Sequence, residues 1–213
     1  KGTALDLGAG NGIASHALAR TGFSVVAVEP DPSNLIGNGA LSKAVHATSY
    51  PITIVSAYGE DLPFPDRSFN VIYARQVLHH AKDLTRMFSE ISRVLAPGGL
   101  FIACREHVVD DSESLAVFLE AHPIHKYTNG EHAYRLGEYL SVMESTGLTV
   151  QRVIGSWDSV INHYPTSNSQ LQAEMKVAML RRRGRLGHFI TRMPGREKQY
   201  RQRKSLADST PGR

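Results

Sequence analysis

A glycine-rich loop near the start of the chain has the spacing of a ligand-binding turn. The segment Leu5–Gly12 has the sequence LDLGAGNG, follows a short apolar run and precedes a helical pattern. Glycines at alternate positions let the backbone turn tightly and approach a ligand, while the following helix presents free N–H groups. A dinucleotide fingerprint has its third glycine at position 13, where Ile13 stands instead. The spacing therefore disfavours a dinucleotide, and the carboxylate of Asp6 beneath the loop favours a cationic or amino-bearing ligand.

Acidic residues follow the next two apolar runs. Glu29 comes directly after Ser24–Val28 and is followed by Pro30. A carboxylate at the tip of the strand beside the glycine loop can accept hydrogen bonds from both hydroxyls of a ribose. The alternative is that Glu29 only caps a helix. After the third run, Gly59 and Glu60 either border an adenine ring or belong to an ordinary acidic loop.

Short apolar runs alternate with helical patterns, and these elements must position the loops just described. Expected strands are Thr3–Leu7, Ser24–Val28, Ile52–Ala57, Asn70–Ala74, Leu100–Cys104 and Leu148–Ile154. Expected helices are Gly12–Thr21, Pro32–Thr48, Asp83–Leu95, Ser112–Ala121, Arg135–Ser145 and Ser169–Leu180. This alternation predicts an α/β fold with a doubly wound, mostly parallel sheet and right-handed crossovers. In such a sheet ligands bind beyond the carboxyl ends of the strands, where the glycine loop and Glu29 lie.

Composition excludes several classes of protein. The 213 residues are 41% hydrophobic and 21% charged, which is typical of a globular protein and not of a disordered or disulfide-stapled chain. No apolar run approaches the roughly 20 residues that a membrane-spanning helix needs. The single cysteine, Cys104, cannot form an internal disulfide, which favours a reducing, cytoplasmic compartment. Because a strand begins almost at Lys1 and a Pro-Gly turn stands at the other end, we expect the fold to be incomplete at one or both ends.

Charge is distributed unevenly along the chain. Residues 1–174 hold 12 Lys and Arg against 18 Asp and Glu, whereas residues 175–213 hold 12 against 2. A strongly basic segment is typical of contact with nucleic acid or with an anionic surface. We expect a main domain over residues 1–155 and a basic extension or insertion over residues 156–213.

Three further segments extend the pattern set by the glycine loop and Glu29. They are EDLPFPDRSFN at residues 60–70, VLHH at 77–80 and EISRVLAPGG at 90–99. In this order and at this spacing, over about residues 3–104, the motifs resemble the class I S-adenosylmethionine-dependent methyltransferases. The group that includes the quinone-biosynthesis methyltransferases is the most similar. The resemblance implies a Rossmann-like fold, S-adenosylmethionine as cofactor and an enzyme that needs no fixed catalytic triad.

The resemblance also implies roles for individual residues. The loop would hold the methionine part of the cofactor near Asp6, Glu29 would take the ribose hydroxyls, and the end of the fourth strand would close the site near the sulfonium. The expected cofactor-binding residues are Asp6, Gly8, Ala9, Gly10, Asn11, Gly12, Glu29, Pro30, Gly59, Glu60, Ala74 and Arg75. Tyr58 stands where many relatives have Asp, so the contact with adenine is expected to differ in this chain.

Histidine and tyrosine are frequent in residues 105–134, which we expect to form a cap over the cofactor. His107 is the first candidate for a catalytic base because it follows the fifth strand, and His80 is the second. Candidate substrate-binding residues are His107, His125, Tyr127 and Tyr134. The alternative is that these histidines pack or lie on the surface. No carboxylate or cysteine stands at the spacing of a metal site beside them, so no metal is expected.

These observations predict transfer of a methyl group, by in-line displacement, to a small-molecule or glycan-like acceptor, on oxygen. One alternative is an RNA-modifying or RNA-binding methyltransferase that uses the basic segment. A second alternative, an NAD-dependent oxidoreductase, is disfavoured by the spacing of the glycine loop. Peripheral contact of the basic segment with anionic surfaces stays open.

Overall fold

The chain divides into two compact units, residues 1–150 and 151–213, each described by itself. The computed structural model describes residues 2–121, 132–155, 158–159, 165–183, 195–196 and 198–200. In the first unit, five strands form a single sheet in the order β3-β2-β1-β4-β5. All four pairings between neighbouring strands are parallel, which confirms the predicted doubly wound sheet.

The elements alternate along the chain as the sequence predicts. The strands are β1 Thr3–Leu7, β2 Ser24–Val28, β3 Ile52–Val55, β4 Phe69–Arg75 and β5 Leu95–Cys104. The helices are α1 Ile13–Arg20, α2 Asn38–His46, α3 Leu84–Val94, α4 Ser112–Ala121, α6 Leu136–Ser145 and α7 Asn168–Arg183, with a short 3-10 turn η1 Leu78–His80. The chain moves outward from β1 to β2 and β3, then returns to pair β4 with β1, so the switch point lies between β1 and β4. The carboxyl ends of these two strands are where a ligand is expected.

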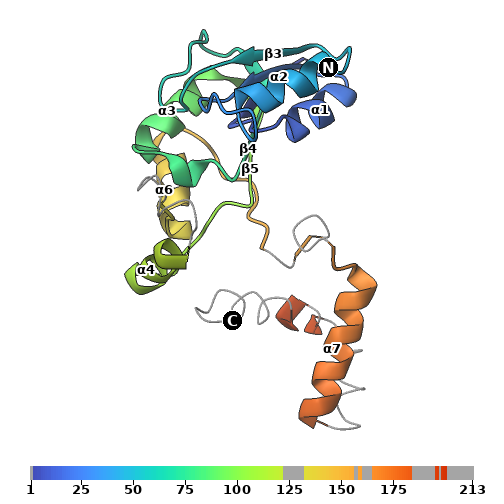
Figure 1. Ribbon diagram of the computed structural model, residues 1–213. Coiled ribbons are helices and arrows are strands. Elements are labelled where there is room, and N and C mark those ends of the chain that lie inside the picture. The colour runs from blue at the N-terminus through green and yellow to red at the C-terminus, as the bar shows by residue number, and fades with distance from the viewer. Residues whose placement is uncertain are drawn as a thin grey trace. The chain divides into compact units, whose positions relative to one another are not determined.

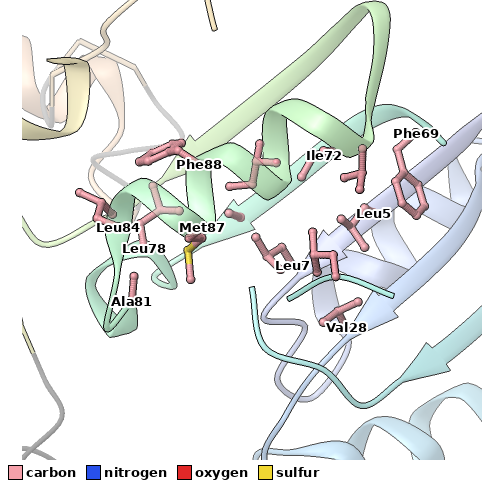
Figure 2. Packing of buried hydrophobic residues seen from close by; sticks show 14 of the residues in the cluster. Leu5, Leu7, Val28, Phe69, Ile72, Leu78, Ala81, Leu84, Met87 and Phe88 are labelled. Carbon is pink, nitrogen blue, oxygen red and sulfur yellow. The ribbon is translucent and has the colours of Figure 1, made fainter. Parts of the chain in front are cut away.

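Helices cover the sheet from both sides (Figure 1). Buried Ala19 of α1 packs with Ala4 and Val25 of the sheet. On the other face, the larger cluster joins Leu5, Leu7 and Ile72 of the strands to Phe88 and Ile91 of α3. Figure 2 shows Leu78, Ala81, Leu84 and Met87 in this same cluster, so the turn after β4 is packed against the start of α3.

The amphipathic character of α3 explains its place. Its buried residues are Leu84, Met87, Phe88, Ile91 and Val94, which recur every three or four positions and form one face. The side chain of Asp83 caps the helix by accepting a hydrogen bond from the Arg86 N–H, at 2.9 Å between N and O.

The fifth strand begins at Leu95, earlier than the expected Leu100, and contains a bulge. Leu95 already pairs with Phe69, and pairing resumes at Leu100 with Val71, so Asn70 alone faces residues 96–99. Pro97 removes a donor from the ladder and Gly98 adopts a φ of +73°, which together let the extra residues loop out within the strand.

Two expected elements differ in the structure. The helix predicted from Pro32 begins only at Asn38, because Asp31 accepts the Ser33 N–H and the Ser33 hydroxyl accepts the Gly37 N–H. Such local side-chain bonds compete with the first helical turn. The strand predicted over 148–154 is not formed, since that segment has no partner strand in the part of the chain that the structure describes.

In the second unit, α7 is the main described element. Its Leu171 and Met175 side chains are buried, whereas most of its other residues are exposed. In neither unit does a described helix combine the length and the apolar character that a membrane crossing requires.

Candidate functional site

The three glycines of the loop after β1 all adopt the left-handed conformation that favours glycine. Gly8, Gly10 and Gly12 have φ values of +66°, +54° and +86°. A Cβ added to Gly8 would lie 2.3 Å from a methyl carbon of Val77, and one on Gly12 would lie 2.6 Å from Leu41. A Cβ on Gly10 would meet only a backbone oxygen at 3.5 Å. Gly8 and Gly12 are thus required by packing, whereas the space over Gly10 is open to a ligand.

Glu29 lies at the tip of β2 and is hydrogen-bonded to the loop. Its Oε2 accepts the Gly10 N–H at 2.7 Å and its Oε1 accepts the Asp31 N–H at 2.9 Å. Only 8% of the residue is exposed. A carboxylate has about four lone-pair sites, so each oxygen can accept one further hydrogen bond. The geometry fits two neighbouring hydroxyls of a ligand.

Asn38, at the start of α2, is a residue that sequence reasoning did not identify. Its Nδ2 donates to the backbone carbonyl of Glu29 at 2.6 Å, and its Oδ1 is buried with no hydrogen-bond partner among the described residues. A buried acceptor of this kind normally has a donor. The orphaned oxygen next to Glu29 therefore fits a site for a ligand that carries hydroxyl or amino groups.

Asp6 lies on the α1 face of β1 and is almost fully buried, at 2% exposure. Its Oδ2 accepts a hydrogen bond from the hydroxyl of Ser15, which lies in α1. Burial raises the pKa of Asp6 to about 6, while the bonds from Ser15 lower it and the charge of Glu29 raises it further. The carboxylate holds the first turn of α1 under the loop, and its contact with an amino group of the cofactor stays a prediction.

The loop after β3 is fixed to the turn before α3. Gly59 is buried, and a Cβ there would lie 2.7 Å from the Met87 methyl carbon. The Glu60 side chain accepts the Lys82 N–H at 2.9 Å. Tyr58 is 65% exposed. Glu60 thus has a structural partner, and the expected contact of Gly59 and Glu60 with adenine stays a prediction.

The ends of β4 and β5 lie side by side, next to the switch point between β1 and β4. Ala74 is buried and Arg75 is exposed, and Arg75 pairs with Cys104. The Tyr73 hydroxyl contacts the Cys104 sulfur at 3.1 Å, and burial raises the pKa of Tyr73. Cys104 therefore contacts a strand neighbour at this edge. Ala74 and Arg75 thus lie at this edge of the sheet, and their contact with the cofactor stays a prediction.

Gln76 and Arg105 directly follow β4 and β5. Both have a left-handed backbone conformation although neither is glycine. Their φ values are +56° and +58°, and the Gln76 N–H donates to the Cys104 carbonyl at 3.1 Å. Such backbone strain is concentrated at functional sites. The strain at Gln76 and Arg105 therefore supports a functional role for the segments that follow β4 and β5.

Both candidate bases lie in one cluster. The His79 ring is 4.1 Å from the His80 ring and 4.4 Å from the His107 ring, measured between centroids. Glu106 accepts a hydrogen bond from His79 Nδ1 at 2.9 Å. The structure thus places His80 and His107, the two candidate bases predicted from separate segments of the sequence, around the same His79 ring. His79 and Glu106 were missed, although each is adjacent in sequence to a nominated residue and follows a strand end.

Tyr134 contacts the same region from the cap. Its hydroxyl donates to the Ala81 carbonyl at 3.1 Å, and the Val109 N–H donates to the Tyr134 carbonyl at 3.2 Å. Tyr134 therefore fastens the cap to the turn after η1, and its role in substrate binding stays a prediction. His125 and Tyr127 lie outside the described residues. In the described ranges, no three His, Cys, Asp or Glu side chains are grouped as a metal site would require.

Comparison with known proteins finds a family that is similar to the first part of this chain. Residues 5–103 match the model of a family described as a methyltransferase domain. This part of the chain is similar in sequence and fold to class I methyltransferases. The similarity implies S-adenosylmethionine as the methyl donor, and the open space over Gly10, the Glu29 carboxylate and the orphaned Asn38 oxygen fit that group.

Curated relatives match this chain over part of their length. A ubiquinone biosynthesis O-methyltransferase from Paramagnetospirillum magneticum is 27% identical over 159 residues, covering 72% of this chain and 61% of that protein. One from Rhizobium etli is 26% identical over 130 residues, covering 61% and 51%. An uncharacterized methyltransferase from Mycobacterium sp. is 37% identical over 100 residues, covering 47% and 37%. The chain spans about half to three fifths of the length of the ubiquinone enzymes that it matches.

Solved structures share the fold of this chain. The YcgJ protein of Bacillus subtilis superposes with a TM-score of 0.61 at 22% identity, covering 84% of this chain and 77% of that one. An S-adenosylmethionine-dependent methyltransferase from Mesorhizobium loti gives 0.61 at 20% identity and covers 84% of each chain. At these identities the likeness concerns the fold.

Proposed function

We propose that this protein transfers the methyl group of S-adenosylmethionine to a hydroxyl oxygen of a small-molecule or glycan-like acceptor. The observation that carries the proposal is the buried Glu29 carboxylate, which is hydrogen-bonded to Gly10 in a part of the chain that is similar to methyltransferases. The names of the Rhizobium and Paramagnetospirillum relatives, which are O-methyltransferases, are compatible with an oxygen acceptor.

The residues at the strand ends would divide the binding of the cofactor. Glu29, supported by Pro30 and Asn38, would accept the ribose hydroxyls, and the loop from Gly8 to Gly12 would lie against the methionine part. Gly59 and Glu60 would border adenine. S-adenosylmethionine supplies a methyl group already activated by a sulfonium, so the chain's own tasks are to orient the acceptor and to take its proton.

His107 is the residue that we propose takes the proton. A phenolic hydroxyl has a pKa of about 10 and is mostly protonated at neutral pH, so a nearby imidazole is a suitable acceptor. When bound, S-adenosylmethionine would supply the methyl carbon to the acceptor oxygen, and its sulfur would keep the electron pair of the broken carbon–sulfur bond. The hydroxyl proton passes to the imidazole of His107. His80, whose ring lies in the same cluster, is the second candidate.

Calorimetry with S-adenosylmethionine tests the cofactor site. We expect E29A to weaken binding about tenfold or more, because it removes a charged acceptor worth roughly 1.5–3 kcal/mol. The matched control is E144Q, which changes an exposed glutamate of α6. Thermal unfolding of both variants shows whether the fold is retained. Full affinity in a folded E29A protein would refute the assignment, and binding of NAD in place of S-adenosylmethionine would favour an oxidoreductase.

A transfer assay with labelled S-adenosylmethionine tests the acceptor. The panel is catechol, methyl glucoside, phenethylamine and total RNA. We expect label on catechol or on the glucoside, and loss of that label in H107A. Label on the amine alone would contradict transfer to oxygen. Label on RNA would favour the second candidate, an RNA-modifying enzyme, to which the 12 basic residues of the segment 175–213 point.

A further inference from the structure

The Glu106 carboxylate organises the turn that follows β4. Its Oε1 accepts the Val77 N–H at 2.9 Å, and its Oε2 accepts the His79 N–H at 3.4 Å and the His79 Nδ1 at 2.9 Å. The side chains of Glu106 and His79 are only 8% and 2% exposed. A buried carboxylate that accepts several N–H groups holds their positions firmly, because leaving any of them unpaired would be unfavourable.

The bond to Glu106 also fixes the orientation of the His79 ring, since Nδ1 must carry the shared proton. In this orientation the His79 ring meets the His107 ring at an interplanar angle of 71°. A second ring neighbour of His107 is Phe118, whose ring centroid is 4.7 Å away. The His107 backbone carbonyl accepts the hydroxyl of the buried Tyr139 at 3.2 Å. His107 is therefore held from α4, α6 and the turn after β4.

Val77 connects this arrangement to the glycine loop. Its N–H is bound by Glu106, and its methyl groups lie where a Cβ on Gly8 would be. The turn that carries His79 is therefore packed against the loop assigned to the methionine part of the cofactor. A shift of Glu106 would be transmitted to both the loop and the histidines.

We propose that Glu106 and His79 are positioning residues for His107, and this inference rests on the proposed function. His79 sets the ring orientation of His107. The Glu106 carboxylate lies near the positive charge that His107 gains when it takes the acceptor's proton, and it stabilises that charge. In this proposal the Glu106 carboxylate helps to orient and stabilise a histidine base, and does not itself take the proton.

Two substitutions separate these contributions. E106Q keeps an oxygen that can accept the Val77 N–H, but it removes the charge and presents an amide donor to His79. H79N keeps a nitrogen donor for Glu106, but it lacks the ring that contacts His107. E106D retains the charge and both acceptor oxygens and serves as the conservative rescue. E144Q is the control, because it neutralises an exposed glutamate outside the site.

The first measurement is NMR of the histidine side chains in the full ¹⁵N-labelled chain, with signals assigned by single substitutions. We expect E106Q and H79N to shift the His107 ring signals and E144Q to leave them unchanged.

The second measurement determines two quantities for each variant, the kcat of methyl transfer to catechol and the Kd for S-adenosylmethionine. We expect E106Q to lower kcat about 10- to 100-fold, which does not exceed the lower end of the roughly 10²- to 10⁴-fold that a general base supplies, with an unchanged Kd. E106D should recover part of the loss.

The outcomes distinguish this inference from the proposed function. Unchanged His107 signals in E106Q and H79N would overturn the positioning role, whatever the activity. An equal loss of kcat and of cofactor affinity, without recovery in E106D, would also overturn it, because it indicates a structural role alone. A wild-type chain that binds S-adenosylmethionine but methylates no acceptor would overturn the proposed function, while shifted His107 signals would still support the contact.

Discussion

At the scale of single residues, the site contains a buried charge that lowers the stability of the fold and that can interact with a ligand. Asp6 is the clearest case, because burial raises its pKa from the ordinary value of 3.8 to about 6. Between these two values the folded state binds more protons than the unfolded state, so this group's contribution to stability falls as pH rises through the window. Above about pH 7 the ionised carboxylate destabilises the fold by roughly 3 kcal/mol, at 1.36 kcal/mol per pKa unit.

The variant D6N tests this account of Asp6. Asparagine can still accept the Ser15 hydroxyl and carries no charge, so we expect D6N to raise the free energy of unfolding by up to roughly 3 kcal/mol at pH 8, and to have little effect at pH 4. Urea unfolding at both pH values measures the difference, with D110N as a control at an exposed aspartate. A pH-independent effect would contradict the assigned pKa. If Asp6 faces the amino group of the cofactor, the stabilised variant should also bind S-adenosylmethionine more weakly.

Two glycines of the loop give a second test at this scale. A methyl group at Gly10 meets open space, whereas one at Gly8 collides with Val77. Both positions have positive φ, so either alanine variant costs about 1–2 kcal/mol of backbone strain. We expect G10A to remain folded and to lose most of its affinity for S-adenosylmethionine, and G8A to lower the melting temperature much further. Calorimetry and thermal unfolding measure the two effects, and equal behaviour of the variants would argue against a ligand over Gly10.

At the scale of elements, the turn from Gln76 to Ala81 is the part of the site that depends most on its neighbours. Glu106 holds it from the segment after β5, Gly8 makes room for it from the first loop, and the Tyr134 hydroxyl holds its end from the cap. Leu78 and Ala81 are buried in the core beside α3 (Figure 2). The turn has few bonds of its own and is positioned by these contacts.

The variant Y134F tests the contact from the cap. Phenylalanine keeps the ring packing against Tyr139 but leaves the Ala81 carbonyl without its donor. We expect a loss of about 1 kcal/mol in the free energy of unfolding and a lower kcat with an unchanged Kd for S-adenosylmethionine. Urea unfolding and the transfer assay measure these quantities. If Tyr134 instead contacts the acceptor directly, KM for the acceptor should rise and stability should not change.

Local sequence patterns were sufficient to predict most of the helices and strands of the sheet, but not the contacts between segments that are distant in the sequence. β1, β2 and α4 have the predicted bounds, and α1 and α3 differ by a residue at either end, because buried alternation and helical periodicity are local signals. The strand expected over 148–154 failed because a strand also needs a partner, which no local pattern shows. The glycine loop was predicted from spacing, whereas the Glu106–His79 pair required knowledge that the end of β5 and the turn after β4 lie together.

At the scale of the whole molecule, the two compact units differ in charge as well as in packing. Residues 1–150 hold 11 Lys and Arg against 16 Asp and Glu, whereas residues 151–213 hold 13 against 4. Every residue of the three hydrophobic clusters lies between Ala4 and Leu148. The candidate site and its supporting core thus belong to the acidic unit, which suits a ligand with a positively charged sulfonium.

A chain of residues 1–150 tests this division. Because the described site residues and the clustered core all lie within it, we expect it to fold and to bind S-adenosylmethionine with a Kd within about twofold of the full chain, a difference below about 0.5 kcal/mol. Circular dichroism and calorimetry, each at low and high salt, provide the measurements. If the basic unit contacts RNA, the full chain alone should bind it, and that affinity should fall steeply with salt through counterion release. A folded chain of residues 1–150 that bound S-adenosylmethionine tenfold more weakly at both low and high salt would contradict this division. Salt screens long-range electrostatic attraction, so a loss that does not change with salt would mean that residues beyond 150 contribute to the site.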